Sequence, residues 1–165
     1  MAGMRHSVLS RGANQPREHR ESEPEDVMLR GMAHAGYWAD DVTAAKEWYT
    51  RLLGTAPYFE RGGPDGRPAY VEFRIGDHQV ELGITDRRFA PPGTPTGPGG
   101  VVLSWHVDDL AAAVDAALAL GAVAHEPITE RGGGFVTASV IDPFGNVLGL
   151  MYNPQYLAVL AEQRG

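Results

Sequence analysis

The chain has 165 residues, a formal net charge of −7 and no cysteine. Disulfides, thiolate metal ligands and cysteine nucleophiles are therefore excluded, and the negative charge argues against nucleic acid or an anionic membrane as a partner. No apolar run approaches the roughly 18 residues that cross a bilayer, and no apolar stretch typical of a signal peptide precedes residue 30. We expect one compact cytoplasmic protein.

The N-terminal segment, residues 1–28, is polar and mixed in charge, with almost no apolar periodicity. Such a segment cannot bury enough apolar surface to offset the entropy lost on folding, so we expect a disordered or loosely packed tail. A second irregular segment, residues 85–100, is rich in proline and glycine, which disfavour helices and central strands, and is predicted to be a linker. It separates residues 29–84 from residues 101–153, and a short C-terminal helix is predicted within residues 154–165.

The two halves repeat one another. Residues 38–42 (WADDV) and 106–110 (HVDDL) are related by an offset of 106 − 38 = 68 residues. In each half an apolar strand leads into an Asp-Asp pair and then an alanine-rich stretch, residues 43–53 and 111–120, that is followed by a glycine. Aspartate suits the N-terminal cap of a helix and glycine suits its C-terminal end. The pattern predicts a strand and a capped helix in both halves.

Further strands are predicted at residues 69–75 and 79–84 in the first half, and at 135–141 and 147–152 in the second. The sequence DPFGN, residues 142–146, has the proline, glycine and asparagine of a tight turn. Side chains alternate between the two faces of a strand. Each half has one helix, which covers only one face of its own sheet. We expect the uncovered faces to curl around a ligand.

Three motifs carry a family resemblance: residues 33–36 (AHAG) leading to Asp41, residues 105–110 (WHVDDL) and residues 141–146 (IDPFGN). With them the chain resembles the vicinal oxygen chelate superfamily, which includes glyoxalase I, extradiol dioxygenases, fosfomycin-resistance enzymes and bleomycin-binding proteins. The resemblance implies an α+β fold of two tandem βαβββ modules, which form a curved mixed sheet around a cavity with the helices on the outer face. It also implies a homodimer as a possible assembly.

The resemblance also implies where a metal would bind. In metal-using members, four ligands come from the first and last strands of each module, and these positions correspond here to His34, Glu81, Val102 and Gly149. Valine and glycine carry no donor atom, so half of the site is missing. Two protein ligands usually hold a divalent ion weakly, and we therefore expect a degenerate metal site and no cofactor, with a divalent metal on His34 and Glu81 as the alternative.

His34 and Glu81 are the predicted catalytic residues. Together they can form a carboxylate–imidazole pair suited to proton transfer without a metal, although Glu81 alone is also typical of a salt bridge at the edge of a strand. Strand alternation places further side chains on the cavity face, where they are predicted to bind the ligand: Trp38, Tyr70, Glu72, Arg74, Ser104 and His106. Arg74 is expected either to neutralise Glu72 or to hold an acidic substrate; a solvent-facing ion pair is the plainer alternative.

Two functions follow from these residues. The first is a binding protein or acid–base catalyst that holds a small organic molecule in its cavity without a metal. The second is a divalent-metal-dependent lyase, isomerase or dioxygenase that uses His34 and Glu81 with further ligands. A module used only for assembly or regulation is a third possibility, without a sequence feature of its own.

Overall fold

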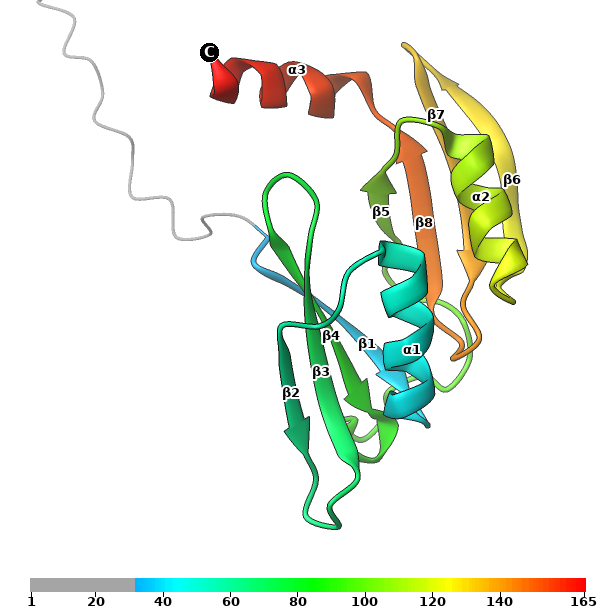
Figure 1. The fold of residues 1–165 in the computed structure, drawn as a ribbon. Coiled ribbons are helices and arrows are strands. Elements are labelled where there is room, and N and C mark those ends of the chain that lie inside the picture. The colour runs from blue at the N-terminus through cyan, green and yellow to red at the C-terminus, as the bar shows by residue number, and fades with distance from the viewer. Residues whose placement is uncertain (1–31) are drawn as a thin grey trace, which may run out of the picture. The chain divides into compact units, whose positions relative to one another are not determined.

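The computed structural model describes residues 32–165, so the predicted tail, residues 1–28, lies outside the described residues. The first module has the order strand, helix and three strands (Figure 1). In it β4 lies between β1, to which it is parallel, and β3, to which it is antiparallel, and β2 forms the outer edge. Its elements are β1 (His34–Ala39), α1 (Val42–Leu53), β2 (Phe59–Gly62), β3 (Pro68–Ile75) and β4 (Val80–Asp86).

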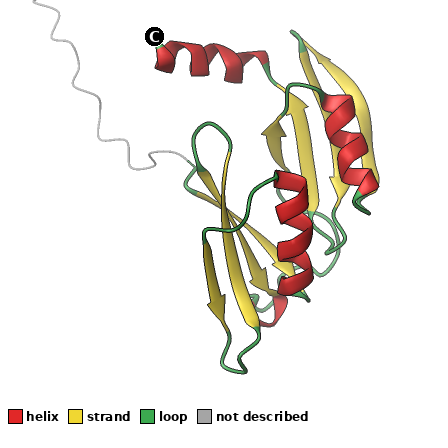
Figure 2. Cartoon of the chain, in the orientation of Figure 1, coloured by secondary structure: helices red, strands yellow, loops and turns green. Residues whose placement is uncertain are grey.

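The second module repeats this arrangement, as Figure 2 shows, with the sheet order β5-β8-β7-β6 in place of β1-β4-β3-β2. Helix α1 packs on β3 and β4, and α2 packs on β6, β7 and β8. The predicted α+β fold of two tandem βαβββ modules is confirmed. Its elements are β5 (Leu103–His106), α2 (Leu110–Ala119), β6 (Val123–Gly132), β7 (Phe135–Ile141) and β8 (Val147–Tyr152), followed by α3 (Pro154–Arg164).

The two module helices begin at the predicted aspartates. The Asp41 side chain accepts a hydrogen bond from the Ala44 backbone N–H, and Asp109 accepts one from Ala112. Gly54 ends α1 in the left-handed region at φ 66°, a conformation that costs glycine no steric strain. The repeated Asp-Asp motif therefore marks the same local structure twice.

Both modules contribute to one hydrophobic core on the helix side of the sheets. From the first module it includes the fully buried Tyr49, Phe73 and Ile84, and from the second Ala117 and Val140. The Trp48 indole N–H donates to the Leu120 carbonyl across the two modules at 2.8 Å. Residues 32–165 consequently form one compact unit.

The β7–β8 turn is the second connection between the modules. Buried Asp142 accepts hydrogen bonds from the backbone N–H groups of Phe144 and Asn146, and also from the Tyr49 hydroxyl at 2.6 Å. Burial, together with the nearby Asp142 carboxylate, raises the pKa of Tyr49 well above its ordinary value. Asn146 in turn exchanges two hydrogen bonds with the Trp38 backbone. Hydrogen bonds within the turn thus stabilise its conformation, and others bind it to the first module.

The last strand of the first module ends later than predicted. β4 continues to Asp86, and a 3₁₀ turn, η1 (Arg87–Phe89), follows it, so the first part of the expected linker is ordered by its contacts. The Arg87 side chain binds the Phe144 carbonyl at 2.9 Å and Asp40 at 3.1 Å. Within residues 32–165, no helix has the length and apolar character that crossing a bilayer requires.

Candidate functional site

The uncovered face of the first sheet carries a group of polar and aromatic side chains, which we call the first-sheet cluster. Hydrogen bonds, ion pairs and a cation–π contact connect its members. The members come from β1, β3, β4 and the segment that enters β2. They are His34, Tyr58, Tyr70, Glu72, Arg74 and Glu81.

The sheet register brings these side chains together. His34 on β1 lies opposite Glu81 on β4, and Glu81 lies opposite Arg74 on β3. Gly83 lies two residues further along β4, opposite Gly36 and Glu72. A Cβ at this position would overlap the His34 Nε2 atom and would lie 2.6 Å from the Tyr70 hydroxyl oxygen. Glycine at this position therefore provides the space in which His34 and Tyr70 meet.

A chain of polar contacts runs from His34 through Tyr70 to Glu72. The Tyr70 hydroxyl donates to Glu72 Oε1 at 2.7 Å and lies 3.3 Å from His34 Nε2. A phenol has a single proton, so the hydroxyl that donates to Glu72 presents a lone pair to the imidazole. We infer that His34 carries its proton on Nε2 and leaves the Nδ1 lone pair available.

Tyr58 connects the two carboxylates. Its hydroxyl oxygen lies 2.7 Å from Glu72 Oε2 and 2.8 Å from Glu81 Oε1. The Arg74 guanidinium covers the Tyr58 ring, 4.0 Å from its centroid, and its Nε lies 3.8 Å from Glu81 Oε1. Glu72 is the more enclosed carboxylate, with a side chain that is 14% exposed against 35% for Glu81.

These contacts change the acidities of the cluster. Burial by itself raises the pKa of Glu72, but hydrogen bonds from Tyr70 and Tyr58 outweigh it and hold the Glu72 pKa below its ordinary value. Burial and the Glu72 carboxylate raise the pKa of Tyr70, and the hydrogen bond to Glu72 is the main cause of the raised pKa of Tyr58. At neutral pH the Tyr58 and Tyr70 hydroxyls are thus protonated and Glu72 is ionised.

Five of the eight predicted site residues lie in this cluster, but two of their pairings differ from those expected. The carboxylate nearest to His34 is Glu72, at 3.7 Å, and not Glu81. Arg74 pairs with Glu81 and not with Glu72. Alternation along the strands predicts which side chains share a face, whereas the contacts depend on the register between strands and on Tyr58.

The other three predicted residues lie away from these contacts. Trp38 is the penultimate residue of β1, where its backbone is hydrogen-bonded to Asn146. Ser104 and His106 belong to β5 and line a separate cavity of about 230 Å³ with Tyr156 of α3. The His106 ring stacks on Tyr156, with centroids 4.7 Å apart, and its Nδ1 accepts from the Asn153 backbone N–H at 3.1 Å. His106 therefore anchors the C-terminal helix.

The residues present do not fit a metal bound in the manner of metal-using relatives. Val102 has no donor, and the space above Gly149 is closed: a Cβ there would lie 2.6 Å from Ser104 Oγ and 2.8 Å from the Leu103 carbonyl oxygen. By the offset of 68 residues, Val102 and Gly149 correspond to His34 and Glu81, which lie opposite each other in the first sheet. In the second sheet, however, Gly149 lies opposite Ser104. Within residues 32–165, no three His, Asp or Glu side chains converge as metal ligands would.

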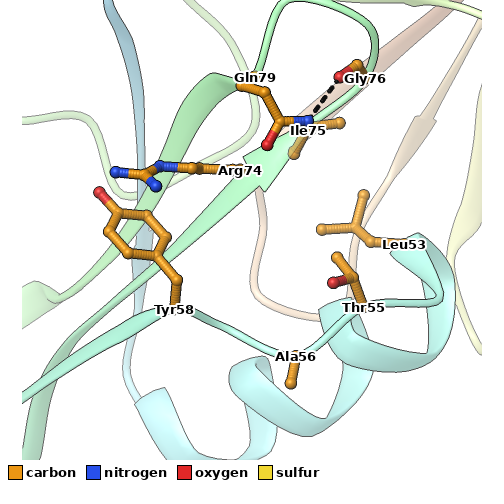
Figure 3. Close-up of a pocket in the computed structure, with 8 residues that line it drawn as sticks. All are labelled: Leu53, Thr55, Ala56, Tyr58, Arg74, Ile75, Gly76 and Gln79. Atoms are coloured by element: carbon orange, nitrogen blue, oxygen red, sulfur yellow. Dashed lines mark hydrogen bonds between the residues drawn. The ribbon is translucent and has the colours of Figure 1, made fainter.

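Tyr58 belongs to the cluster but was not predicted from the sequence. This residue lies in the connection between α1 and β2, where no strand alternation assigns its side chain to a face. Tyr58 and Arg74 form one wall of a cavity of about 520 Å³ next to the cluster (Figure 3). The rest of the lining is largely apolar or uncharged: Leu53, Thr55, Ala56, Ile75, Gly76 and Gln79.

The uncovered face of the second sheet has a smaller polar group. The Ser139 hydroxyl donates to Glu126 at 3.3 Å, and its oxygen lies 2.9 Å from His125 Nδ1. Ser139 is 2% exposed, so its hydroxyl is enclosed by these neighbours. The arrangement satisfies a buried hydroxyl, which a polar group inside a sheet requires.

Comparison with known proteins agrees with this architecture. The family model described as Glyoxalase/Bleomycin resistance protein/Dioxygenase superfamily matches residues 31–150. A glyoxalase-related enzyme from Fulvimarina pelagi has a similar structure, with a TM-score of 0.61 and 20% identity over 76% of this chain and 90% of that one. A glyoxalase/bleomycin resistance protein from Catenulispora acidiphila has a TM-score of 0.52 and 22% identity, over 73% and 96%. No curated protein matches the sequence. At these identities the structures are evidence for the fold.

Proposed function

We propose that this chain, which belongs to the Glyoxalase/Bleomycin resistance protein/Dioxygenase superfamily, binds a small organic molecule at the first-sheet cluster without the help of a metal. The cluster lies on a face that no helix of its module covers, beside a cavity of about 520 Å³. Pockets of this size, with a few polar groups on a largely apolar wall, are typical of small-molecule sites.

One observation carries the metal-free part of the proposal. The two potential donors of the first module already have protein partners, since His34 Nε2 faces Tyr70 and Glu72, and Glu81 faces Tyr58 and Arg74. The two corresponding positions of the second module offer a valine and an enclosed glycine. A ligand can form hydrogen bonds with the exposed side of the first-sheet cluster. This binding does not require the two carboxylates to rearrange around a metal ion.

The geometry also favours a second function, acid–base catalysis. With its proton on Nε2, His34 can accept another on Nδ1, and among residues 32–165 no hydrogen bond occupies that atom. The imidazolium formed would lie 3.7 Å from Glu72 Oε1. His34 would then act as the base, and Tyr70 and Glu72 would orient its ring.

Metal-free ligand binding can be tested with two-dimensional NMR of labelled, chelator-treated protein against a library of small organic fragments. We expect bound fragments to shift the resonances of His34, Tyr58 and Tyr70, and His34→Ala to weaken binding by about tenfold, the value of one good polar contact. Ser104→Ala, on the uncovered face of the second sheet, is the matched control and should leave the affinity unchanged.

The second part of the test measures the metal content of the protein before chelator treatment. A near-stoichiometric divalent ion that His34→Ala removes, together with fragment binding that disappears after chelation, would contradict the proposal. The protein is an acid–base catalyst, and not only a binding protein, if it converts a bound compound and if His34→Ala abolishes this turnover while Ser104→Ala preserves it.

A further inference from the structure

We propose that the ligand is a small organic cation, an amine or a guanidinium on a flat or apolar body, and that Arg74 holds the place of its charged group in the unliganded protein. This inference rests on the proposed function, because it specifies the ligand of the same site. Three features of the cluster support it: the position of Arg74, the hydrogen-bond balance of the two carboxylates and the adjacent cavity.

Arg74 already makes the contacts that such a ligand would make. Its guanidinium carbon lies 4.0 Å above the Tyr58 ring, and its Nε lies 3.8 Å from Glu81 Oε1. The Arg74 side chain is 51% exposed, and its separation from Glu81 is longer than that of a direct hydrogen bond. Arg74 is therefore held weakly and can be displaced by a cation that binds Glu81 more closely.

The two carboxylates have room for one more donor. Three short oxygen–oxygen contacts join the phenols to them: Tyr70 to Glu72 at 2.7 Å, Tyr58 to Glu72 at 2.7 Å and Tyr58 to Glu81 at 2.8 Å. The two phenols supply two protons, so one of the contacts made by Tyr58 lacks a hydrogen. An N–H group of a ligand can supply the missing donor to Glu81, while Tyr58 donates to Glu72.

The cavity shown in Figure 3 has space for the body of the ligand. The Tyr58 ring and the Arg74 side chain form its wall on the side of the cluster, and Leu53, Ala56 and Ile75 give it apolar surface. None of the lining residues is acidic, and Arg74 is the single charged residue among them. A ligand that places its charged end at Glu81 and its apolar end in this cavity buries both without leaving an unpaired carboxylate.

An acidic ligand is the opposing possibility, because Arg74 is a cation. Such a ligand would approach Arg74 next to both Glu72 and Glu81, and like charges at this range repel. It would also compete with Glu81 for the guanidinium. The two possibilities predict opposite effects of removing Arg74, so a single variant separates them.

The experiment uses three flat probes of nearly equal shape: benzamidine as the cation, benzoate as the anion and benzamide as the neutral control. Each is titrated by NMR into the wild-type protein and into Arg74→Met, which keeps the aliphatic stem. We expect benzamidine to bind Arg74→Met about tenfold more tightly than wild type, and to lose about tenfold when Glu81→Gln is added to that variant. Arg131→Met, on the second sheet, removes the same charge elsewhere and should leave binding unchanged.

Benzoate binding that Arg74→Met abolishes would overturn the inference and leave the proposed function intact, with an acid as the ligand. Equal benzamidine affinities in wild type and Arg74→Met would overturn the place-holding by Arg74. If no probe shifts the cluster resonances in either folded protein, the inference is overturned as well. The proposed function fails separately, when the fragment library also leaves His34, Tyr58 and Tyr70 unshifted.

Discussion

The two modules share one fold and differ on their uncovered faces. Each has a four-stranded sheet of the same order, and each has a helix capped by an aspartate. The first face carries two glutamates, two tyrosines, a histidine and an arginine that polar contacts connect. The second carries the smaller group of His125, Glu126 and Ser139. The helix side of the sheet must keep its shape to pack the core, but the other face can change its chemistry without loss of the fold.

The same comparison extends to the turns. The β7–β8 turn contains Asp142, which is 3% exposed and accepts hydrogen bonds from both modules. The β3–β4 turn of the first module contains Asp77, whose side chain is partly exposed and contacts Tyr156 and Arg164 of the C-terminal helix. The two equivalent turns thus both bind another part of the protein, one through a buried aspartate and the other through a partly exposed one.

The largest effect is expected for Asp142→Ala. The change leaves the Tyr49 hydroxyl and two backbone N–H groups without their acceptor inside the protein. We expect the free energy of unfolding to fall by about 3 kcal/mol, measured by urea denaturation, because unsatisfied buried donors are costly.

Asp142→Asn is the control for this experiment. Its amide oxygen retains acceptor capacity at the same size, so its loss should be clearly smaller. A loss below about 1 kcal/mol for Asp142→Ala would show that the turn does not join the modules as described.

The glycines of the two sheets offer a matched pair. A Cβ at Gly149 would meet the Leu103 carbonyl oxygen at 2.8 Å, so the backbone itself must shift, and Gly149→Ala should destabilise the protein by about 2 kcal/mol. A Cβ at Gly83 would meet only the ends of the His34 and Tyr70 side chains, which can move. Gly83→Ala should therefore cost about 1 kcal/mol or less in urea denaturation but displace the His34 ring resonances. Equal losses from both substitutions would refute the distinction.

The pH dependence of the first-sheet cluster is tested with Glu72→Gln. The Glu72 pKa is lowered, so its ionised form stabilises the folded state above the ordinary pKa of 4.5, and that stabilisation is lost as the pH falls through the lowered value. Tyr58 and Tyr70 have raised pKa values, so their protonated forms stabilise the fold below pH 10.0 and lose this effect as the pH rises further. In Glu72→Gln we expect both phenols to titrate at lower pH than in wild type, followed by tyrosinate absorbance.

Tyr70→Phe and Tyr58→Phe identify the two titrations in that experiment. Each should remove one high-pH tyrosinate transition and leave the other. An absorbance titration of Glu72→Gln that overlays the wild-type curve would contradict the proposed hydrogen bonds to this carboxylate.

The smallest effect is expected for Asp77→Ala. Asp77 binds Arg164 at 2.7 Å and Tyr156 at 3.0 Å, but its side chain is 37% exposed. Exposed pairs contribute about 0 to 1 kcal/mol, and the urea midpoint should change far less than for Asp142→Ala. A loss as large as that of Asp142→Ala would mean that the C-terminal helix holds the first module to the second.

The fold could be predicted because it depends on local signals that occur twice. The Asp-Asp pairs, the glycines after the helices and the alternation along β3 act over a few residues, and each agrees with the structure. The candidate site could be predicted in part for the same reason, since alternation assigned His34, Tyr70, Glu72, Arg74 and Glu81 to one face.

What the sequence by itself determined is therefore the architecture and the face of the first sheet on which the cluster residues of its strands lie. The tertiary structure alone decided which side chains meet: that Glu72 and not Glu81 accompanies His34, that Tyr58 joins the carboxylates, and that His106 supports the C-terminal helix. The physical reason is range. Turn and cap preferences are local, whereas these contacts join strands and connections that are distant in sequence and depend on register, and a register is set by the packing of the whole sheet.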